Sequence, residues 1–389
     1  MSAGAVGSVY ERLLTATGSG AALESTGSLS APVVDPDLQV RRLMQDIGYL
    51  EDRLGEHADP EALRQLTAGA RHGLREVVDR GDRARLGRDE LAGLEAVVHS
   101  DGSRPVLFVE DDFVDLLAPA ARDCAATLAR VESEVRTACQ AAGRVDDPGA
   151  TLGYQGTAWA VGDGLVVTNY HVLQAISLHP ARSDGSFTGD LKPGVTVDFG
   201  AEIGAQPGGR RFPVRRVVAV GPAGDPSHAH PSLRGVNFDG LDLAVLELEE
   251  VAGQSFPTPV EVARGDDPVT RGALASRGRL VYVVGFPGSA RSTTPDVFAA
   301  LFAGVKGVKR LTPGLLTYGR GDVADDGRRW VIGHDASTLG GSSGSMVVDL
   351  EAGGRLVLGI HFAGDPGRVN WAHSLEGATP QLVDAVPGW

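Results

Sequence analysis

The chain has 389 residues, 42% of them hydrophobic and 22% charged, and a formal net charge of -14 at pH 7. This length exceeds what one hydrophobic core usually organises, so we expect more than one domain. The negative charge argues against a general nucleic-acid-binding protein, which needs a basic surface to displace counterions. The sequence has no apolar run long enough to cross a bilayer. We therefore expect no nucleic acid and no membrane among the partners.

The N-terminal segment, residues 1–35, is rich in Gly, Ala, Ser and Thr and is predicted to be flexible. Its start lacks the basic residues and the continuous apolar block of a secretion signal. The chain contains only two cysteines, Cys124 and Cys139, which agrees with a reducing compartment. These features predict a cytoplasmic protein whose two thiols are buried and take no part in chemistry.

Residues 36–110 are predicted to form a small helical domain. Apolar side chains recur there at helical spacing in three stretches, which are Leu38 to Leu54, Leu63 to Val78 and Leu91 to Val98. Residues 111–150 are predicted to form a connecting helix, because one continuous apolar stripe runs from Leu117 to Val135.

The pattern changes to short β-strands in residues 151–389. Apolar runs separated by Gly, Pro and Asp clusters predict strands at 156–161, 165–169, 195–199, 215–220, 241–248, 280–286, 315–318, 346–350 and 356–362. Many short strands joined by such turns indicate a barrel or a sandwich. A short terminal helix is expected to start at Thr379-Pro380.

Three polar residues in this β-rich part have the types that nucleophilic catalysis requires. His171 follows a strand in Thr-Asn-Tyr-His-Val, Asp242 enters an apolar run in Leu-Asp-Leu-Ala-Val, and Ser343 stands in Gly-Gly-Ser-Ser-Gly-Ser. A serine hydroxyl becomes a useful nucleophile when an imidazole takes its proton, and a carboxylate fixes that imidazole. The glycines around Ser343 allow a sharp turn that aims the N–H groups of Gly341 and Ser343 at an oxyanion.

With these motifs in His, Asp, Ser order, residues 151–389 resemble the trypsin-like, chymotrypsin-fold serine peptidases. The resemblance is to the bacterial branch that includes the glutamyl endopeptidases and the HtrA proteases, and Gly285-Phe286-Pro287 fits the same pattern. It implies a mainly β fold of two six-stranded antiparallel β-barrels, following the α-helical N-terminal region. It also implies a serine endopeptidase that acts on proteins or peptides without a cofactor or a metal. The resemblance does not reach residues 1–100.

Differences from the family pattern bear on activation and specificity. Ser342 stands where digestive members have an Asp that receives a new N-terminus, so activation by N-terminal insertion is not expected. Ser337 stands where Arg- and Lys-cleaving members have an Asp. Thr338 and His361 match residues that receive a glutamate side chain in the glutamyl endopeptidases. The resemblance therefore implies cleavage after Glu or Asp.

Two alternatives concern the role of the whole chain. The helical domain could regulate the enzyme by docking a partner protein. The chain could instead be a binding module with a peptidase fold that holds a peptide without cutting it, although the intact His171, Asp242 and Ser343 argue against this.

Other polar clusters have less specific patterns. His228 and His230, with Asp225, could suggest a metal site, but their spacing fits no standard site and a solvated loop is the better interpretation. Lys306, Lys309 and Arg310 are likewise interpreted as a solvated loop rather than a phosphate site. Asp239 is a competitor of Asp242, but it precedes the predicted strand.

Overall fold

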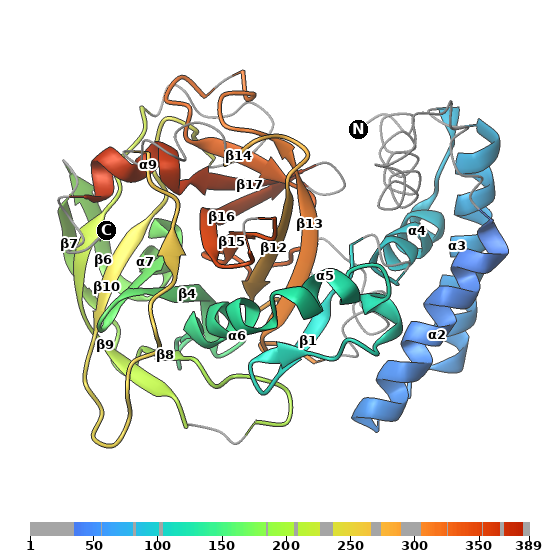
Figure 1. Cartoon of the computed structure of the whole chain (residues 1–389), viewed down its shortest axis with the longest axis horizontal. Coiled ribbons are helices and arrows are strands. Elements are labelled where there is room, and N and C mark those ends of the chain that lie inside the picture. Colours follow the sequence, from blue (N-terminus) through green and yellow to red (C-terminus); the bar gives the residue numbers. More distant parts are fainter. Residues whose placement is uncertain are drawn as a thin grey trace. The chain divides into compact units, whose positions relative to one another are not determined.

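The computed structural model of the chain is shown in Figure 1, and two compact units are distinguished in it. It describes residues 35–55, 57–80, 83–100, 104–183, 186–205, 209–225, 236–265, 274–288, 305–324, 326–351, 353–365 and 369–383. The first unit comprises Met1–Leu107, Asp115–Ala126 and Ala290–Val305, and the second comprises Phe108–Val114, Thr127–Ser289 and Lys306–Trp389. The predicted flexible segment lies outside the described residues, except for Asp35.

The first unit is built on three helices, α2 (Pro36–Leu54), α3 (Pro60–Arg80) and α4 (Arg88–Ser100). They agree with the three helical stretches expected from the sequence. Two glycines allow α3 and α4 to pack closely, because a Cβ on Gly69 would lie 2.3 Å from the Asp89 carbonyl oxygen and one on Gly93 would lie 2.0 Å from the Ala70 nitrogen.

Helix α2 has a defined start and a buried apolar face. The Asp35 carboxylate accepts the N–H groups of Asp37 and Leu38, which satisfies two donors that a helix start leaves free. Val40, Leu43, Ile47 and Leu50 are buried at the spacing of one helix face. Tyr49 Oη donates to Asp115 Oδ2 at 2.5 Å, which ties α2 to the segment that precedes the short 3-10 helix η3 (Pro119–Ala121).

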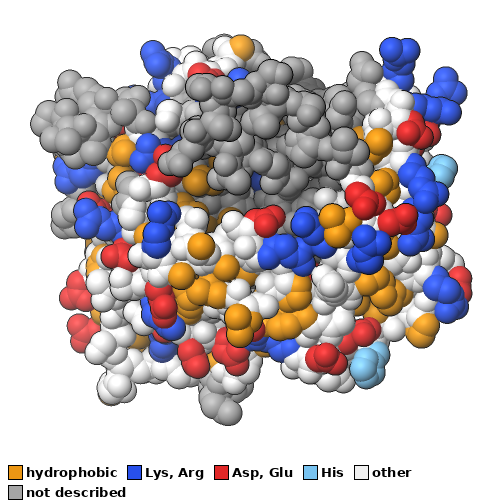
Figure 2. Space-filling view, turned by 45° about the vertical axis from the view of Figure 1, so that its right-hand side comes forward, with side chains coloured by type: hydrophobic (Ala, Val, Ile, Leu, Met, Phe, Trp, Pro, Cys, Tyr) orange, Lys and Arg blue, Asp and Glu red, His pale blue; other side chains and the backbone are white. Residues whose placement is uncertain are grey.

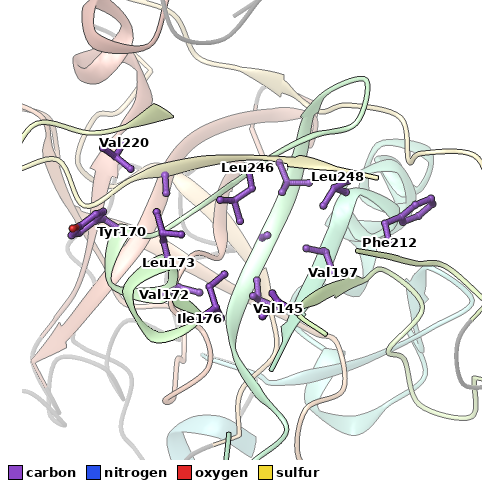
Figure 3. Close-up of a cluster of buried hydrophobic side chains, with 14 of the residues drawn as sticks. Val145, Tyr170, Val172, Leu173, Ile176, Val197, Phe212, Val220, Leu246 and Leu248 are labelled. Atoms are coloured by element: carbon purple, nitrogen blue, oxygen red, sulfur yellow. The ribbon is translucent and has the colours of Figure 1, made fainter. Parts of the chain in front are cut away.

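Six strands of the second unit form a closed antiparallel barrel in the order β10-β5-β4-β3-β8-β9. Their bounds are β3 Ala142–Asp146, β4 Tyr154–Gly162, β5 Leu165–Thr168, β8 Thr196–Asp198, β9 Arg211–Val220 and β10 Ala244–Leu248. Figure 3 shows the core of this barrel, where Val145, Val197 and Leu246 point inward with Phe212. Between β5 and β8 the chain forms helix α7 (Tyr170–Ala175) and a hairpin of β6 (Ser177–Ser183) and β7 (Ser186–Leu191).

A second ring of six antiparallel strands follows the order β12-β15-β16-β17-β14-β13, and pairing of β13 with β12 closes it. Its strands are β12 Leu280–Gly285, β13 Arg310–Tyr318, β14 Val331–His334, β15 Met346–Asp349, β16 Leu356–Asp365 and β17 Val369–Ser374. Strands β1 (Leu107–Glu110), β2 (Phe113–Val114) and β11 (Glu261–Val262) extend the sheet. The two-barrel architecture and the helical N-terminal region expected from the sequence are thus both present.

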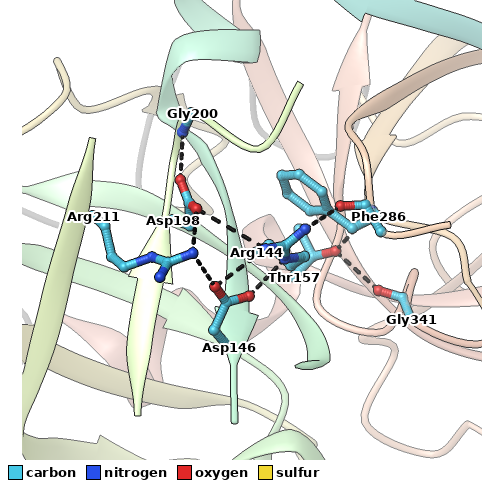
Figure 4. A network of polar contacts seen from close by, with 9 residues as sticks. Arg144, Asp146, Thr157, Asp198, Gly200, Arg211, Phe286 and Gly341 are labelled. Atoms are coloured by element: carbon cyan, nitrogen blue, oxygen red, sulfur yellow. Dashed lines mark hydrogen bonds and ion pairs between the residues drawn. The ribbon is translucent and has the colours of Figure 1, made fainter. Parts of the chain in front are cut away.

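An ion-pair network joins three neighbouring strands of the first barrel (Figure 4). Arg144 on β3 donates from Nε to Asp146 Oδ1 at 2.6 Å. Arg211 on β9 pairs with Asp146 at 3.0 Å and with Asp198, at the end of β8, at 2.9 Å. Because the two carboxylates are largely buried, each needs these partners to remain charged at an acceptable cost.

The connecting helix predicted for residues 111–150 is wrong as one element. The structure has η3, α5 (Ala125–Arg130) and α6 (Glu132–Ala141), and β3 already begins at Ala142. The break falls at Val131, whose φ of -123° and ψ of 29° are not helical. Its side chain contacts Gly354, where an added Cβ would lie 3.0 Å from the Val131 Cβ. Packing against the second barrel therefore overrides the local periodicity.

The solvated-loop interpretation of the basic cluster is wrong for two of its three residues. Lys309 is fully buried, and its Nζ donates to the Phe199 carbonyl oxygen at 2.9 Å and to Glu202 Oε1 at 2.6 Å. Arg310 is 2% exposed, and its guanidinium lies 3.1 Å from the ring centroid of Phe108. These cations are structural parts of the second unit.

The terminal helix α9 (Leu375–Leu382) begins earlier than expected. Its N-cap is Ser374, whose side chain accepts the N–H of Gly377, so Pro380 stands inside the helix. None of the helices in the described ranges is long and apolar enough to span a membrane.

Charges of both signs lie on the face drawn in Figure 2. Acidic and basic side chains stand next to one another there, with hydrophobic side chains between them. The net charge of -14 is therefore not gathered into one acidic patch on this face.

Candidate active site

The pairing of β5 with β10 brings His171 and Asp242 together. Ala244, at the start of β10, stands opposite Thr168, at the end of β5. In an antiparallel pair, residues just before one strand face residues just after the other. Asp242 therefore precedes β10, rather than lying within it as the sequence suggested, and meets the first turn of α7.

The carboxylate of Asp242 receives two donors from His171. Its Oδ2 is 2.6 Å from His171 Nδ1, and its Oδ1 accepts the backbone N–H of His171 at 2.9 Å. The Asn169 side chain donates to the Asp242 carbonyl oxygen at 2.9 Å. The imidazole is thereby fixed in orientation, with Nδ1 as the donor toward the carboxylate.

Burial and charge act in opposite directions on this pair. Burial disfavours the imidazolium, but the charge and the hydrogen bond of Asp242 outweigh it and raise the pKa of His171. Burial likewise favours the neutral acid at Asp242, but His171 outweighs it, so the pKa of Asp242 is lowered. The carboxylate thus stays ionised and stabilises a proton on the ring.

His373, on β17, is a neighbour of this pair that sequence reasoning missed. Its Nε2 accepts the backbone N–H of Asp242 at 3.0 Å, and its ring stacks on Phe362 at 4.1 Å between centroids. Burial lowers the pKa of His373 to about 4, so the ring is neutral at pH 7. The pairing depends on a contact 131 residues away along the chain, which local sequence cannot indicate.

The segment that carries Ser343 is held by hydrogen bonds at four consecutive carbonyl groups. The Gly340 oxygen accepts from Gly288 N at 2.8 Å, and the Ser342 oxygen accepts from Ser345 N at 3.0 Å. Thr157, on β4, holds the other two: its Oγ1 donates to the Gly341 oxygen at 3.1 Å and its backbone N–H to the Ser343 oxygen at 2.8 Å.

This arrangement fixes the direction of two N–H groups. Among the described residues every peptide bond is trans, and in a trans peptide the N–H points opposite to the preceding carbonyl. The N–H of Gly341 therefore points away from Gly288, and that of Ser343 points away from the turn formed with Ser345. Neither group has a hydrogen-bond acceptor within the part of the chain that the structure describes.

Backbone conformations in this segment require glycine. Gly341 has a φ of +101° and Gly344 a φ of +86°. A Cβ on Gly344 would also lie 2.1 Å from the Thr157 carbonyl oxygen. The glycines expected to permit a sharp turn are therefore required where they stand.

Hydrogen bonds join the Ser343 segment to β4 and β16, and β4 in turn to the end of β5. The Thr157 carbonyl oxygen accepts from Thr168 Oγ1 at 2.7 Å, and Thr168 ends the strand that leads to His171. The N–H of Gly344 donates to the His361 carbonyl oxygen on β16 at 2.9 Å. His171 and Asp242 are thus in direct contact, and Ser343 lies on a segment bound to both neighbouring strands.

The residues expected to set specificity lie around strands β14, β16 and β17. Thr338 Oγ1 donates to Asn370 Oδ1 at 2.7 Å, and Asn370 pairs with His334 in the β14–β17 register. His361 is 4% exposed, and its Nδ1 lies 3.3 Å from His334 Nε2. Burial, with the charge of His171, lowers the pKa of His361 to about 3. Ser337 is partly buried in the segment between β14 and Ser343.

The interpretation of His228 and His230 as a solvated loop rather than a metal site is not tested by the described residues. No group of three or more His, Cys, Asp or Glu side chains within the described ranges has the arrangement of a metal site. His228 and His230 lie outside those ranges. Cys124 and Cys139 are free and buried, and burial raises the pKa of each thiol to about 12, as expected of unreactive core cysteines.

Two closed six-stranded barrels with a histidine–aspartate pair at a strand end define the class of chymotrypsin-fold hydrolases. Comparison with known proteins agrees. A family model for the trypsin-like peptidase domain matches residues 156–360. A probable serine protease of Lysobacter enzymogenes is 32% identical over 328 residues, which is 80% of this chain and 80% of the relative. The chain belongs to the family of trypsin-like serine proteases.

Solved structures similar to the chain include two of the Mycobacterium tuberculosis protein Rv3671c. The inactive form of this protease is 18% identical and has a TM-score of 0.35, with 67% of this chain and 96% of that chain covered. An inactive mutant of it is 19% identical and has a TM-score of 0.37, with 66% and 92% covered.

Proposed function

We propose that the protein hydrolyses peptide bonds through a triad of Ser343, His171 and Asp242 and a covalent acyl-enzyme. The observation that carries the proposal is the His171–Asp242 pair, because its carboxylate accepts both the ring and the backbone N–H of one histidine. In this mechanism Nε2 of His171 takes the proton of Ser343 as the hydroxyl attacks the substrate carbonyl. The same proton then passes to the leaving amine.

The N–H groups of Gly341 and Ser343 would receive the oxyanion of the tetrahedral intermediate. Support comes from the four anchored carbonyls, which aim these donors before a substrate arrives. Donors that are already oriented need no reorganisation during the reaction, and each contributes about 10²- to 10³-fold to kcat.

A fluorophosphonate probe tests the proposal, because it reacts with an activated serine. The wild-type chain is expected to be labelled, and Ser343→Ala and His171→Ala are expected to abolish labelling. Ser133→Ala, on the exposed face of α6, serves as the matched control and is expected to be labelled like the wild type. No labelling of the folded wild type would instead favour the peptide-binding module.

We further propose that the enzyme cleaves after Glu or Asp. Two features support this: Ser337 offers no negative charge for a basic side chain, and His361 and Thr338 lie close to the Ser343 segment. His334 Nδ1 has no partner in its buried site among the described residues. Since an unpaired buried acceptor is less costly than an unpaired buried donor, His334 donates from Nε2 to His361 Nδ1. The other ring nitrogen of His361 then carries a proton, which suits a carboxylate.

Cleavage of a peptide library followed by mass spectrometry tests this preference. Cuts after Glu or Asp should dominate, and His361→Gln should reduce that preference by at least tenfold while cleavage after other residues persists. Cuts mainly after Arg or Lys would show that the assignment of Ser337, Thr338 and His361 is wrong.

A third proposal is that the N-terminal helical unit regulates the enzyme by docking a protein partner. Its support is that helices α2 and α3 expose apolar side chains at Leu38, Met44 and Val78, which are 39%, 40% and 47% exposed. To test it, a specific cleavage site is introduced at residues 101–103 and peptidase activity is compared before and after cutting. We expect a change of at least threefold, and equal activities would contradict the proposal.

We place this chemistry in the cytoplasm as a proposal, supported by the two buried free thiols. Activity that is unchanged by dithiothreitol is the expected result. Loss of activity under reduction would contradict the placement.

A further inference from the structure

The side chain of Thr157 is the feature from which a further role follows. It is fully buried on β4, in the first barrel, yet the hydrogen bonds of its hydroxyl are to groups that belong to the second barrel or lead to it. Its Oγ1 donates to the Gly341 oxygen at 3.1 Å and receives the Phe286 N–H at 3.3 Å, as Figure 4 shows. Ser345 Oγ donates to Thr157 Oγ1 at 3.4 Å.

The hydroxyl holds the oxygen end of the Gly341–Ser342 peptide, whose N–H end donates to the Leu339 carbonyl oxygen at 2.9 Å. The Gly340, Ser342 and Ser343 oxygens all accept from backbone N–H groups, whereas the Gly341 oxygen accepts from the Thr157 side chain. A glycine with a φ of +101° has no Cβ to limit its ψ. Without the hydroxyl, this peptide would keep only the bond of the Ser342 N–H to Leu339, so its carbonyl end could tilt from the orientation seen here.

That peptide connects the two donors of the oxyanion site. Gly341 N–H precedes it and Ser343 N–H follows it, so its orientation sets the angle between them. The backbone of Thr157 adds to this, since its N–H holds the Ser343 oxygen at 2.8 Å. One residue of the first barrel thus restrains both halves of the site.

We propose that Thr157 is a positioning residue that aligns the N–H groups of Gly341 and Ser343 for the oxyanion. This inference rests on the proposed peptidase function. Thr157 touches neither substrate nor reacting atoms. Its effect should therefore appear in the stabilisation of the transition state and not in the binding of substrate.

Thr157→Val tests the role, because valine has nearly the shape of threonine but no hydroxyl. Complete loss of one oxyanion donor lowers kcat by about 10²- to 10³-fold, so misalignment should lower it by about 10- to 100-fold. KM should stay within about threefold of the wild-type value. Thr157→Ser, which keeps the hydroxyl, should restore kcat to within about threefold.

The matched control is Thr312→Val on β13. Thr312 is also buried, at 4% exposed, and its Oγ1 donates to the Val283 oxygen at 3.4 Å, away from Ser343. This variant measures what the loss of one buried threonine hydroxyl does to the fold, and it should keep wild-type kcat. If Thr157→Val unfolds at the assay temperature, Thr157→Ala provides the same comparison with less crowding.

A second measurement separates alignment from general damage to the structure. The affinity for a peptide boronate, which forms a tetrahedral adduct with a serine, should fall in Thr157→Val by the same factor as kcat/KM. The affinity for a product peptide, which forms no oxyanion, should not change.

Two results would overturn the inference, and they are distinguishable. A wild-type chain that neither cleaves peptides nor takes up a fluorophosphonate overturns the proposed function and this inference with it. An active wild type whose kcat and boronate affinity are the same in Thr157→Val overturns the role of Thr157 alone.

Discussion

Replacing Asp242 by Asn changes one oxygen of the His171–Asp242 pair to an NH2 group. In the wild type, Asp242 Oδ1 accepts the His171 backbone N–H at 2.9 Å and Oδ2 lies 2.6 Å from the ring Nδ1. In the variant the amide oxygen must stay with the backbone N–H, so the NH2 group faces Nδ1. Nδ1 then has to accept, and the ring proton moves to Nε2.

This tautomer cannot take a proton from Ser343, because its Nε2 already carries one. The same substitution in a Ser-His-Asp triad lowers kcat by about 10⁴-fold, which corresponds to about 5.4 kcal/mol in the barrier. We therefore expect kcat of Asp242→Asn to fall by about ten-thousandfold. KM should change little, since in the proposed triad the Asp242 carboxylate contacts His171 and not the substrate.

The assay is steady-state cleavage of a peptide substrate by the purified wild type and variant between pH 6 and 10. Asp239→Asn is the matched control, because it removes a carboxylate three residues away, and it should keep kcat within about threefold. Retention of more than a tenth of kcat by Asp242→Asn would refute the reasoning, as would an equal loss in Asp239→Asn.

Three further predictions concern pH and stability. Because Asp242 raises the pKa of His171, kcat/KM should rise with pH to a midpoint above 6.5, and a midpoint below 6 would contradict the pairing. Burial lowers the pKa of three histidines, His334, His361 and His373. The unfolded chain then binds protons that the folded chain excludes below about pH 6.5. As the pH is lowered from 6 to 5, the free energy of unfolding should therefore fall by about 1.4 kcal/mol per pH unit for each histidine. Urea unfolding at the two pH values measures this. In His334→Asn the free energy of unfolding should change less steeply with pH, and an unchanged pH dependence would contradict the role of the buried histidines. Lys309→Met should destabilise the fold by about 3–5 kcal/mol, because the largely buried Glu202 carboxylate loses its ion-pair partner. Adding Glu202→Gln should recover part of that loss. An unchanged denaturation midpoint in Lys309→Met would mean that the pair is solvated.

Local patterns in the sequence were sufficient for the strands and helices that carry their own signal. The nine predicted strands all correspond to strands of the two barrels, and the three N-terminal helices are present. The His171 and Asp242 motifs were also predictable, because each stands beside an apolar strand whose register then brings the two residues together.

Elements shaped by distant packing were not predictable. The hairpin of β6 and β7 has a polar, largely exposed β7, so no apolar alternation marks it. Helices α5 and α6 share one periodic stripe, yet Val131 breaks it to pack on Gly354. The periodicity of one segment does not indicate which other part of the protein that segment packs against.

The supporting residues of the site were missed for the same reason. Thr157 contacts the Gly341 oxygen across 184 residues of sequence, and His373 reaches Asp242 across 131. Neither belongs to a motif with a fixed spacing. The available signal was a histidine in an apolar strand, at His373, where burial without a partner would be unfavourable.

The hydroxyl of Ser342 accepts the N–H of Leu339 at 3.3 Å, within its own loop. A carboxylate at this position would need a cation from another part of the chain, and the enzyme would be inactive until that cation was in place. Here a neutral bond a few residues long closes the loop as soon as the barrels have folded. On the proposed chemistry each new copy is competent from the moment of folding, and restraint has to act on substrate access instead of on a maturation step.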